Sequence, residues 1–127
     1  PLAAMLLADQ GAEVIKVEKP GQGDPLRDLG PFVDGPDGPH SLYWAVEGRG
    51  RKSVTLDLSH PEGQRVFRDL AARSDVLCEN FRPGTLERWN IDPSRLDKRL
   101  VTVRISVFGQ DGPKSGRPGL DRNGVAY

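Results

Sequence analysis

Three side chains suited to ligand recognition stand at the ends of apolar segments that are predicted to be strands. Lys19 follows one such segment, and Asn80 and Phe81 follow another. A lysine neutralises an anion, an amide side chain both donates and accepts hydrogen bonds, and a phenyl ring offers a face for stacking. Arg88, on the helix predicted to follow Phe81, adds a guanidinium able to meet a phosphate. Together these residue types suit a ligand that contains a base and phosphates.

The same residues also have a purely structural interpretation. Asn80 is suited to capping the helix that Pro83 begins, Phe81 to packing in a core, and Arg88 to a solvated helix surface. Spacing alone does not decide between the two interpretations. These residue types therefore do not identify a particular ligand.

Two further segments resemble phosphate-binding loops only weakly. Gly21-Gln-Gly-Asp24 lacks the third glycine that opens a helix in dinucleotide-binding loops, which favours a plain turn. Gly48-Arg-Gly-Arg-Lys52 is a basic cluster before a strand that could approach phosphates, but a solvated basic turn is the commoner explanation. Neither segment predicts nucleotide binding by itself.

The sequence predicts neither a metal site nor a legible nucleophile. His40 and His60 have no second histidine or cysteine at ligand spacing. Cys78 lies between apolar neighbours, where a buried and inert thiol is expected. Asp121 is a lone carboxylate in a final loop. No Ser-His-Asp or Cys-His arrangement can be read from the chain.

The predicted elements alternate between strands and helices. Strands are expected over residues 13–18, 52–58 and 100–107 and in the apolar run within 75–81, with helices at the start of the chain, over 61–73 and after Pro83. Ser59 to Glu62 reads as a capping box, and residues 20–39 as a long ordered loop. Because parallel strands need crossover connections, this alternation predicts an α/β fold with an open, mostly parallel sheet and flanking helices. In such sheets ligands bind beyond the carboxyl ends of the strands, where Lys19, Asn80 and Phe81 stand.

The composition narrows the class of protein. The 127 residues suit one domain or part of a larger one, and 18 basic residues balance 18 acidic ones, which argues against nucleic acid as a partner. The apolar opening segment, residues 1–9, is too short to cross a membrane and lacks a basic leader. One cysteine fits a reducing compartment, so a cytoplasmic protein is expected. Both ends of the chain are expected to be cut from a longer protein.

Read in order, the motifs of the chain resemble those of the class III CoA-transferases, the CaiB/BaiF group. The matching segments are Ala3 to Glu18, Gly23-Asp-Pro25, Arg51-Lys-Ser-Val-Thr-Leu-Asp-Leu58, Pro61-Glu-Gly63, Asp75-Val-Leu-Cys-Glu-Asn-Phe-Arg-Pro-Gly84, Ser106-Val-Phe-Gly-Gln110 and Arg117-Pro-Gly-Leu-Asp121. Glu79-Asn-Phe-Arg-Pro-Gly84 is the most diagnostic of them. The resemblance implies that residues 1–127 are the amino-terminal part of a Rossmann-like, CoA-binding large domain.

The resemblance also implies a set of ligand contacts. Carried over residue by residue, the family's contacts to the adenosine phosphate of coenzyme A fall on Lys19, Leu56, Asn80, Phe81, Arg88 and Arg117. Phe81 and Leu56 would flank the adenine, and Lys19 and Arg88 would offset phosphate charge. Coenzyme A and acyl-CoA are expected as substrates, with no tightly bound cofactor.

In the family an aspartate carboxylate attacks the acyl-CoA thioester. That aspartate is expected beyond Tyr127, so no catalytic residue is assigned within the chain, and an interlocked homodimer is expected for the full-length protein. Racemases of the superfamily carry a histidine where this chain has Leu120, which favours a transferase. An acyl-CoA racemase and a non-catalytic CoA-binding module remain the alternatives.

Overall fold

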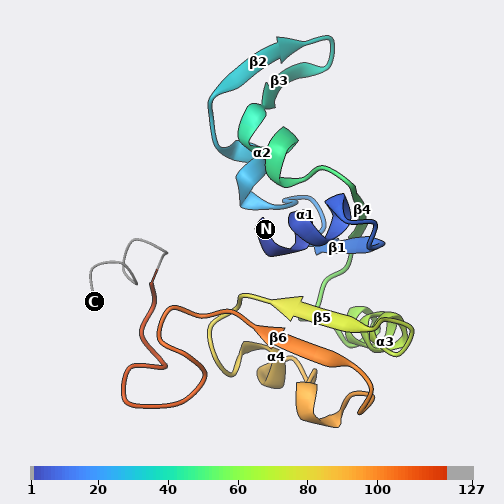
Figure 1. Cartoon of the computed structure of the whole chain (residues 1–127), viewed down its shortest axis with the longest axis vertical. Helices are drawn as coiled ribbons and strands as arrows, with labels where there is room; N and C mark the ends of the chain where they lie inside the picture. The colour runs from blue at the N-terminus through green and yellow to red at the C-terminus, as the bar shows by residue number, and fades with distance from the viewer. Residues whose placement is uncertain (1, 120–127) are drawn as a thin grey trace. The chain divides into compact units, whose positions relative to one another are not determined.

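The computed structural model describes residues 2–119. The chain divides into two compact units, Pro1–Asp57 and Leu58–Tyr127. Each unit contains one pair of parallel strands (Figure 1). No helix in the described range is long and apolar enough to cross a bilayer.

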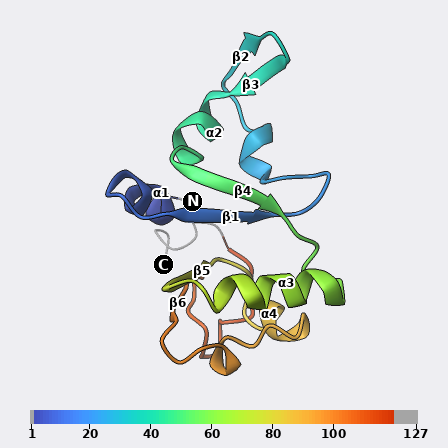
Figure 2. The same cartoon turned by 90° about the vertical axis from the view of Figure 1, so that its right-hand side faces the viewer.

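The first unit is built on two parallel strands, β1 (Val14–Glu18) and β4 (Arg51–Thr55). Figure 2 shows them side by side and running in the same direction. Helix α1 (Leu2–Asp9) precedes β1 and buries Met5. Gly11, at a φ of 96°, ends this helix as expected, because the left-handed turn lets the next amide, that of Ala12, reach the Leu7 carbonyl at 3.0 Å.

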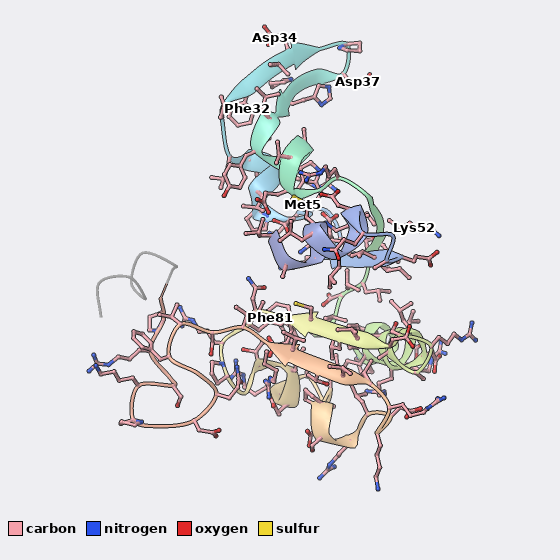
Figure 3. The ribbon with its side chains drawn as sticks, viewed as in Figure 1. Met5, Phe32, Asp34, Asp37, Lys52 and Phe81 are labelled. Carbon is pink, nitrogen blue, oxygen red and sulfur yellow. The ribbon has the colours of Figure 1, made fainter. Side chains whose placement is uncertain are left out.

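The segment that joins β1 to β4 is more ordered than the predicted loop. It contains the short helix η1 (Pro25–Asp28), the antiparallel strands β2 (Phe32–Gly35) and β3 (Gly38–Ser41), and helix α2 (Leu42–Glu47). The expectation of a loop throughout residues 20–39 is therefore wrong for its second half. Gly-Pro-Asp-Gly at 35–38 is turn chemistry that closes a hairpin, and Asp37 lies at its tip (Figure 3).

The second unit pairs β5 (Val76–Glu79) in parallel with β6 (Val101–Arg104). Helix α3 (Pro61–Ala71) precedes β5, and the single turn α4 (Thr85–Arg88) and the 3-10 turn η2 (Pro93–Arg95) lie between the strands in sequence. The apolar core of this unit includes six residues: Leu58, Phe67, Ala71, Leu86, Ile91 and Leu100. Leu86, at the centre of α4, and Ile91 are the most completely buried side chains, so α4 is anchored to the unit by its apolar face.

The cap of α3 differs from the expected capping box. The N-cap residue is His60, whose Nδ1 accepts a hydrogen bond from the Glu62 amide at 3.4 Å. Ser59 stands one position too early for the role predicted for it. Pro61 occupies the first helical turn, where its missing N–H costs nothing.

The α/β class and the parallel pairing of strands are confirmed, whereas the expected burial of β5 on both faces is wrong. Side chains alternate along a strand, and Val76 and Cys78 lie exposed on one face while Glu79 is buried on the other. In β6 the residues paired with them, Val101 and Val103, are exposed as well. The Cys78 thiol, which was expected to be buried, is therefore on an exposed, apolar face of this strand pair.

Candidate functional site

In the first unit the predicted contact residues Lys19 and Leu56 are neighbours. Lys19 directly follows β1 and Leu56 directly follows β4, and the Leu56 amide donates to the Glu18 carbonyl at 3.0 Å. Lys19 also begins a tight turn, in which its carbonyl accepts from the Gly23 amide at 3.0 Å. The plain turn expected over Gly21–Asp24 is thus found. The ammonium group of Lys19 is exposed and forms no ion pair with any residue of 2–119.

The buried carboxylate of Glu18 holds this turn against the strand pair. It accepts hydrogen bonds from the Asp24 amide at 2.8 Å, from two guanidinium nitrogens of Arg27 at 2.9 Å each and from the Ser53 hydroxyl at 2.7 Å. These donors, Arg27 foremost, lower the pKa of Glu18 to about 2, although burial acts in the opposite direction. Glu18 therefore fixes the loop on which Lys19 stands.

Arg27 in turn lies over the ring of Trp44, with its guanidinium carbon 4.1 Å from the ring centroid. A hollow of about 380 Å³ is found beside this pair and is also lined by His40 and Ser41. None of the six residues predicted to contact a ligand lines the hollow. It is the product of the hairpin and α2 packing around Arg27.

In the second unit Asn80 and Phe81 follow β5, and Phe81 lies just beyond the arrowhead of that strand (Figure 3). The Phe81 and Trp89 rings pack in a T-shaped arrangement, with a centroid separation of 5.3 Å and an interplanar angle of 79°. Arg88 ends α4 and donates from Nη2 to the Thr85 hydroxyl at 2.9 Å. Arg88 makes no ion pair within the described residues, so its positive charge is unneutralised there.

These positions decide two of the structural alternatives. Asn80 does not cap α4, because the N-cap residue is Gly84 and no side chain bonds to that end of the helix. Phe81 is not a core residue, because 39% of it is exposed. Arg88 is exposed on its helix, as both interpretations require. One partly exposed aromatic ring, one exposed amide and one guanidinium without an ion pair therefore occur within a short span after β5.

A second buried glutamate, Glu79, ends β5 beside these residues. Its carboxylate accepts from the Phe81 amide at 2.7 Å and from Nε of Arg104 at 2.6 Å. Arg104 also donates to both carboxylate oxygens of Glu87, at 2.7 and 3.3 Å. Hydrogen bonding to Arg104 lowers the pKa of Glu87, and hydrogen bonding to Glu87 is the largest of the effects that raise the pKa of Arg104.

Sequence reasoning did not find Glu18 or Glu79 as supports of the site. The available signal was an acidic residue at the end of each of two largely apolar strands, a position where a charge is costly to bury unless it is paired. Such a residue predicts a basic partner. The sequence does not say that Arg27 and Arg104 are the partners.

The remaining predicted position, Arg117, lies in the loop of residues 109–119. Its amide donates to the Lys114 carbonyl at 2.9 Å, and its side chain is exposed. No hydrogen bond or ion pair joins the Arg117 side chain to Asn80, Phe81 or Arg88 among residues 2–119. Leu120 and Asp121 lie outside the described residues. No cluster of potential metal ligands is present among the residues that the structure describes.

The sequence pattern of the family described as CoA-transferase family III matches residues 1–127, the whole chain. The chain belongs to this family. It is 48% identical to the succinyl-CoA–L-malate CoA-transferase beta subunit of Chloroflexus aurantiacus, with 100% of the chain and 33% of that protein covered. It is 45% identical to the succinyl-CoA–D-citramalate CoA-transferase of the same organism, with 99% of the chain and 31% of that protein covered.

A solved structure has a similar fold over most of the chain. The crystal structure of Rv3272 from Mycobacterium tuberculosis matches with a TM-score of 0.85 and 40% identity, covering 95% of the chain and 34% of the other. The CoA-transferase family III chain thus spans about a third of the length of the relatives it matches.

Proposed function

We propose that residues 1–127 form part of the CoA-binding large domain of an enzyme that transfers coenzyme A between carboxylic acids. The observation that carries this proposal is the cluster after β5, where Asn80, Phe81 and Arg88 present an amide, an aromatic face and an unpaired guanidinium in a chain of this family. Coenzyme A has a planar base and phosphates, for which these groups are chemically complementary.

In this proposal the exposed face of Phe81 stacks on the adenine. The T-shaped contact with Trp89 holds the Phe81 ring, so little conformational freedom is lost when the base binds. Asn80 pairs with polar atoms of the nucleoside. Arg88 retains donors beyond the one used by Thr85, and these bind a phosphate through charge-assisted hydrogen bonds.

For the first unit, taken by itself, we propose Lys19 and Leu56 as ligand contacts. The exposed ammonium of Lys19 offsets negative charge, and the half-buried Leu56 gives an apolar contact. Arg117 adds a further guanidinium for the phosphates. The turn that Glu18 holds keeps Lys19 in place at the strand end.

The chemical step is assigned to an aspartate outside residues 1–127. Its carboxylate attacks the donor thioester, the C–S bond breaks, and the CoA thiolate leaves behind a mixed anhydride. The thiolate attacks the aspartyl carbonyl, releases the donor acid and forms an enzyme-CoA thioester. The acceptor carboxylate then repeats these two exchanges in reverse, so that the acceptor leaves as its CoA thioester and the aspartate is regenerated. No tightly bound cofactor takes part.

For the substrates we infer a succinyl-CoA donor and a hydroxylated dicarboxylate acceptor. The support is that two relatives, at 48% and 45% identity, are named for succinyl-CoA with L-malate and with D-citramalate. The enzyme is proposed to act as an interlocked homodimer in the cytoplasm, with a Rossmann-like sheet.

The test is isothermal calorimetry of the complete gene product with coenzyme A. Replacing Asn80 and Arg88 together by alanine is expected to weaken binding by at least about tenfold, because a stacked base loses one polar partner and a phosphate loses its cation. Arg95→Ala is the matched control, since Arg95 is a highly exposed arginine of the same unit outside the cluster. Unchanged affinity in the double variant contradicts the proposed site.

A second measurement separates the transferase from a racemase. Succinyl-CoA is incubated with L-malate in deuterated water. Formation of malyl-CoA with release of succinate supports the proposal, whereas deuterium incorporation at the α-carbon of an acyl-CoA without acyl transfer favours the racemase.

A further inference from the structure

Arg104 stands between two carboxylates whose sequence neighbours are the proposed ligand contacts. In the parallel register Arg104 lies directly opposite Glu79, which precedes Asn80 and Phe81. Its Nε donates to Glu79 at 2.6 Å, and its Nη1 donates to Glu87, the residue before Arg88, at 2.7 Å. One guanidinium therefore joins the two short segments that carry the cluster.

The link to Glu79 extends to the backbone of the cluster. The second carboxylate oxygen of Glu79 accepts from the Phe81 amide at 2.7 Å, so the carboxylate that Arg104 orients also fixes the turn into Phe81. The Glu79 side chain is only 3% exposed, which leaves little room for water to replace Arg104 as its partner. The Ile105 amide, bonded to the Glu79 carbonyl at 2.8 Å, holds the two strands together at this point.

The link to Glu87 acts on α4, which is a single turn of four residues. A helix this short does not hold its own conformation, because nucleation costs more than one turn of hydrogen bonds returns. Burial of Leu86 fixes one side of the turn. Arg104 fixes another side through Glu87, and the direction in which Arg88 leaves the helix follows from both.

The geometry requires an arginine. The planar guanidinium reaches one carboxylate through Nε and the other through Nη1 and Nη2, with all of these donors in one rigid group. A lysine ammonium at the same position reaches one carboxylate but does not span both in a fixed plane.

We propose that Arg104 is a positioning residue that sets Asn80, Phe81 and Arg88 for the adenosine phosphate of coenzyme A. This inference rests on the proposed function. No ligand contact is assigned to Arg104, because each of its three nitrogens donates to Glu79 or Glu87.

The test uses the complete gene product with Arg104→Lys and Arg104→Met. The KM for the acyl-CoA donor and the dissociation constant of coenzyme A are expected to rise about tenfold in both variants, while kcat stays within about twofold because no reacting group is changed. Arg99→Lys is the matched control, since Arg99 makes a bidentate but highly exposed pair with Asp97 in the same unit. If Arg104→Met does not fold, Arg104→Lys and Glu87→Gln carry the test, with thermal melting as the check of folding.

A double-mutant cycle distinguishes positioning from general stability. Combining Arg104→Lys with Arg88→Ala is expected to weaken CoA binding by clearly less than the two single losses together, because Arg104 acts in part through the residue already removed. Fully additive losses overturn the positioning role, and so do folded Arg104 variants with an unchanged KM. In either case Arg88→Ala still weakens binding if the proposed site is right. If Arg88→Ala with Asn80→Ala has no effect, the proposed function itself fails.

Discussion

Each unit contains a buried glutamate paired with an arginine, but the two arginines come from different parts of the chain. Each ends its first parallel strand in a buried glutamate, Glu18 or Glu79, and each glutamate binds an arginine and a backbone amide. In the first unit the arginine, Arg27, is nine residues away and belongs to the loop that follows the strand. In the second unit the arginine, Arg104, is twenty-five residues away and belongs to the neighbouring strand.

The difference shows what each buried charge stabilises. Glu18 fastens a loop to the strand that it follows, whereas Glu79 receives a guanidinium that also holds a helical turn through Glu87. Arg27 is 40% exposed and can be hydrated if its partner is lost, while Arg104 is 21% exposed. Replacing each glutamate by glutamine removes the charge at nearly constant size, so a matched series measures the difference.

Glu79→Gln is expected to have the largest effect, a loss of about 3 kcal/mol in the free energy of unfolding. Arg104 keeps Glu87 but loses its most buried partner, and it has little access to water. Urea unfolding of the complete gene product measures the loss. A smaller loss of stability than that of Glu18→Gln would contradict the expectation that the Glu79 pair stabilises the protein more than the Glu18 pair.

Glu18→Gln is expected to cost about 2 kcal/mol near neutral pH. The pKa of Glu18 falls from its ordinary 4.5 to about 2 on folding, so the folded state favours the charged form. The stabilisation is complete above about pH 4.5 and is lost as the pH falls through about 2. The gap between wild type and variant should therefore shrink by about half between pH 6 and pH 3.5, as unfolding curves at both pH values would reveal. A constant gap contradicts the assigned role of the charge.

Trp44→Leu is expected to cost about 1 kcal/mol, because it removes the ring on which the Arg27 guanidinium lies. Trp44→Phe keeps an aromatic face and should lose less. The same unfolding measurement compares them. Equal losses in the two variants would show that ring chemistry does not contribute to holding Arg27.

Glu13→Gln is expected to change stability by less than about 0.5 kcal/mol. Its pair with Lys52 spans 2.8 Å, but both side chains are mostly exposed, so water replaces the lost partner. This variant sets the baseline of the glutamate series. A loss as large as that of Glu18→Gln would mean that burial is not what separates these pairs.

The sequence predicted the parts of the fold that depend on local pattern. The apolar runs that became β1, β4, β5 and β6 were located, and their parallel pairing followed from the helices between them. Lys19, Asn80 and Phe81 were placed at strand ends for the same reason. Their proposed role in binding remains a prediction.

The parts that were missed depend on contacts distant in sequence. Nothing local marks Arg104 as the partner of Glu79 and Glu87 among the many arginines of the chain. The exposure of Cys78 was missed because an apolar run has the same appearance whether one or both of its faces are covered. His60 replaced Ser59 as the cap of α3 because an imidazole nitrogen also accepts from the second amide of a helix.

Cys78 gives the exposed apolar face of β5 and β6 a practical use. It is the single cysteine of the 127 residues, and its free thiol lies on that face. A thiol-reactive dye or spin label attached there would sit among Val76, Val101 and Val103 and would report on its surroundings without engineered cysteines in this part of the protein. The rate of alkylation in the native protein, compared with the rate in urea, then becomes a direct reading of how far this face is covered.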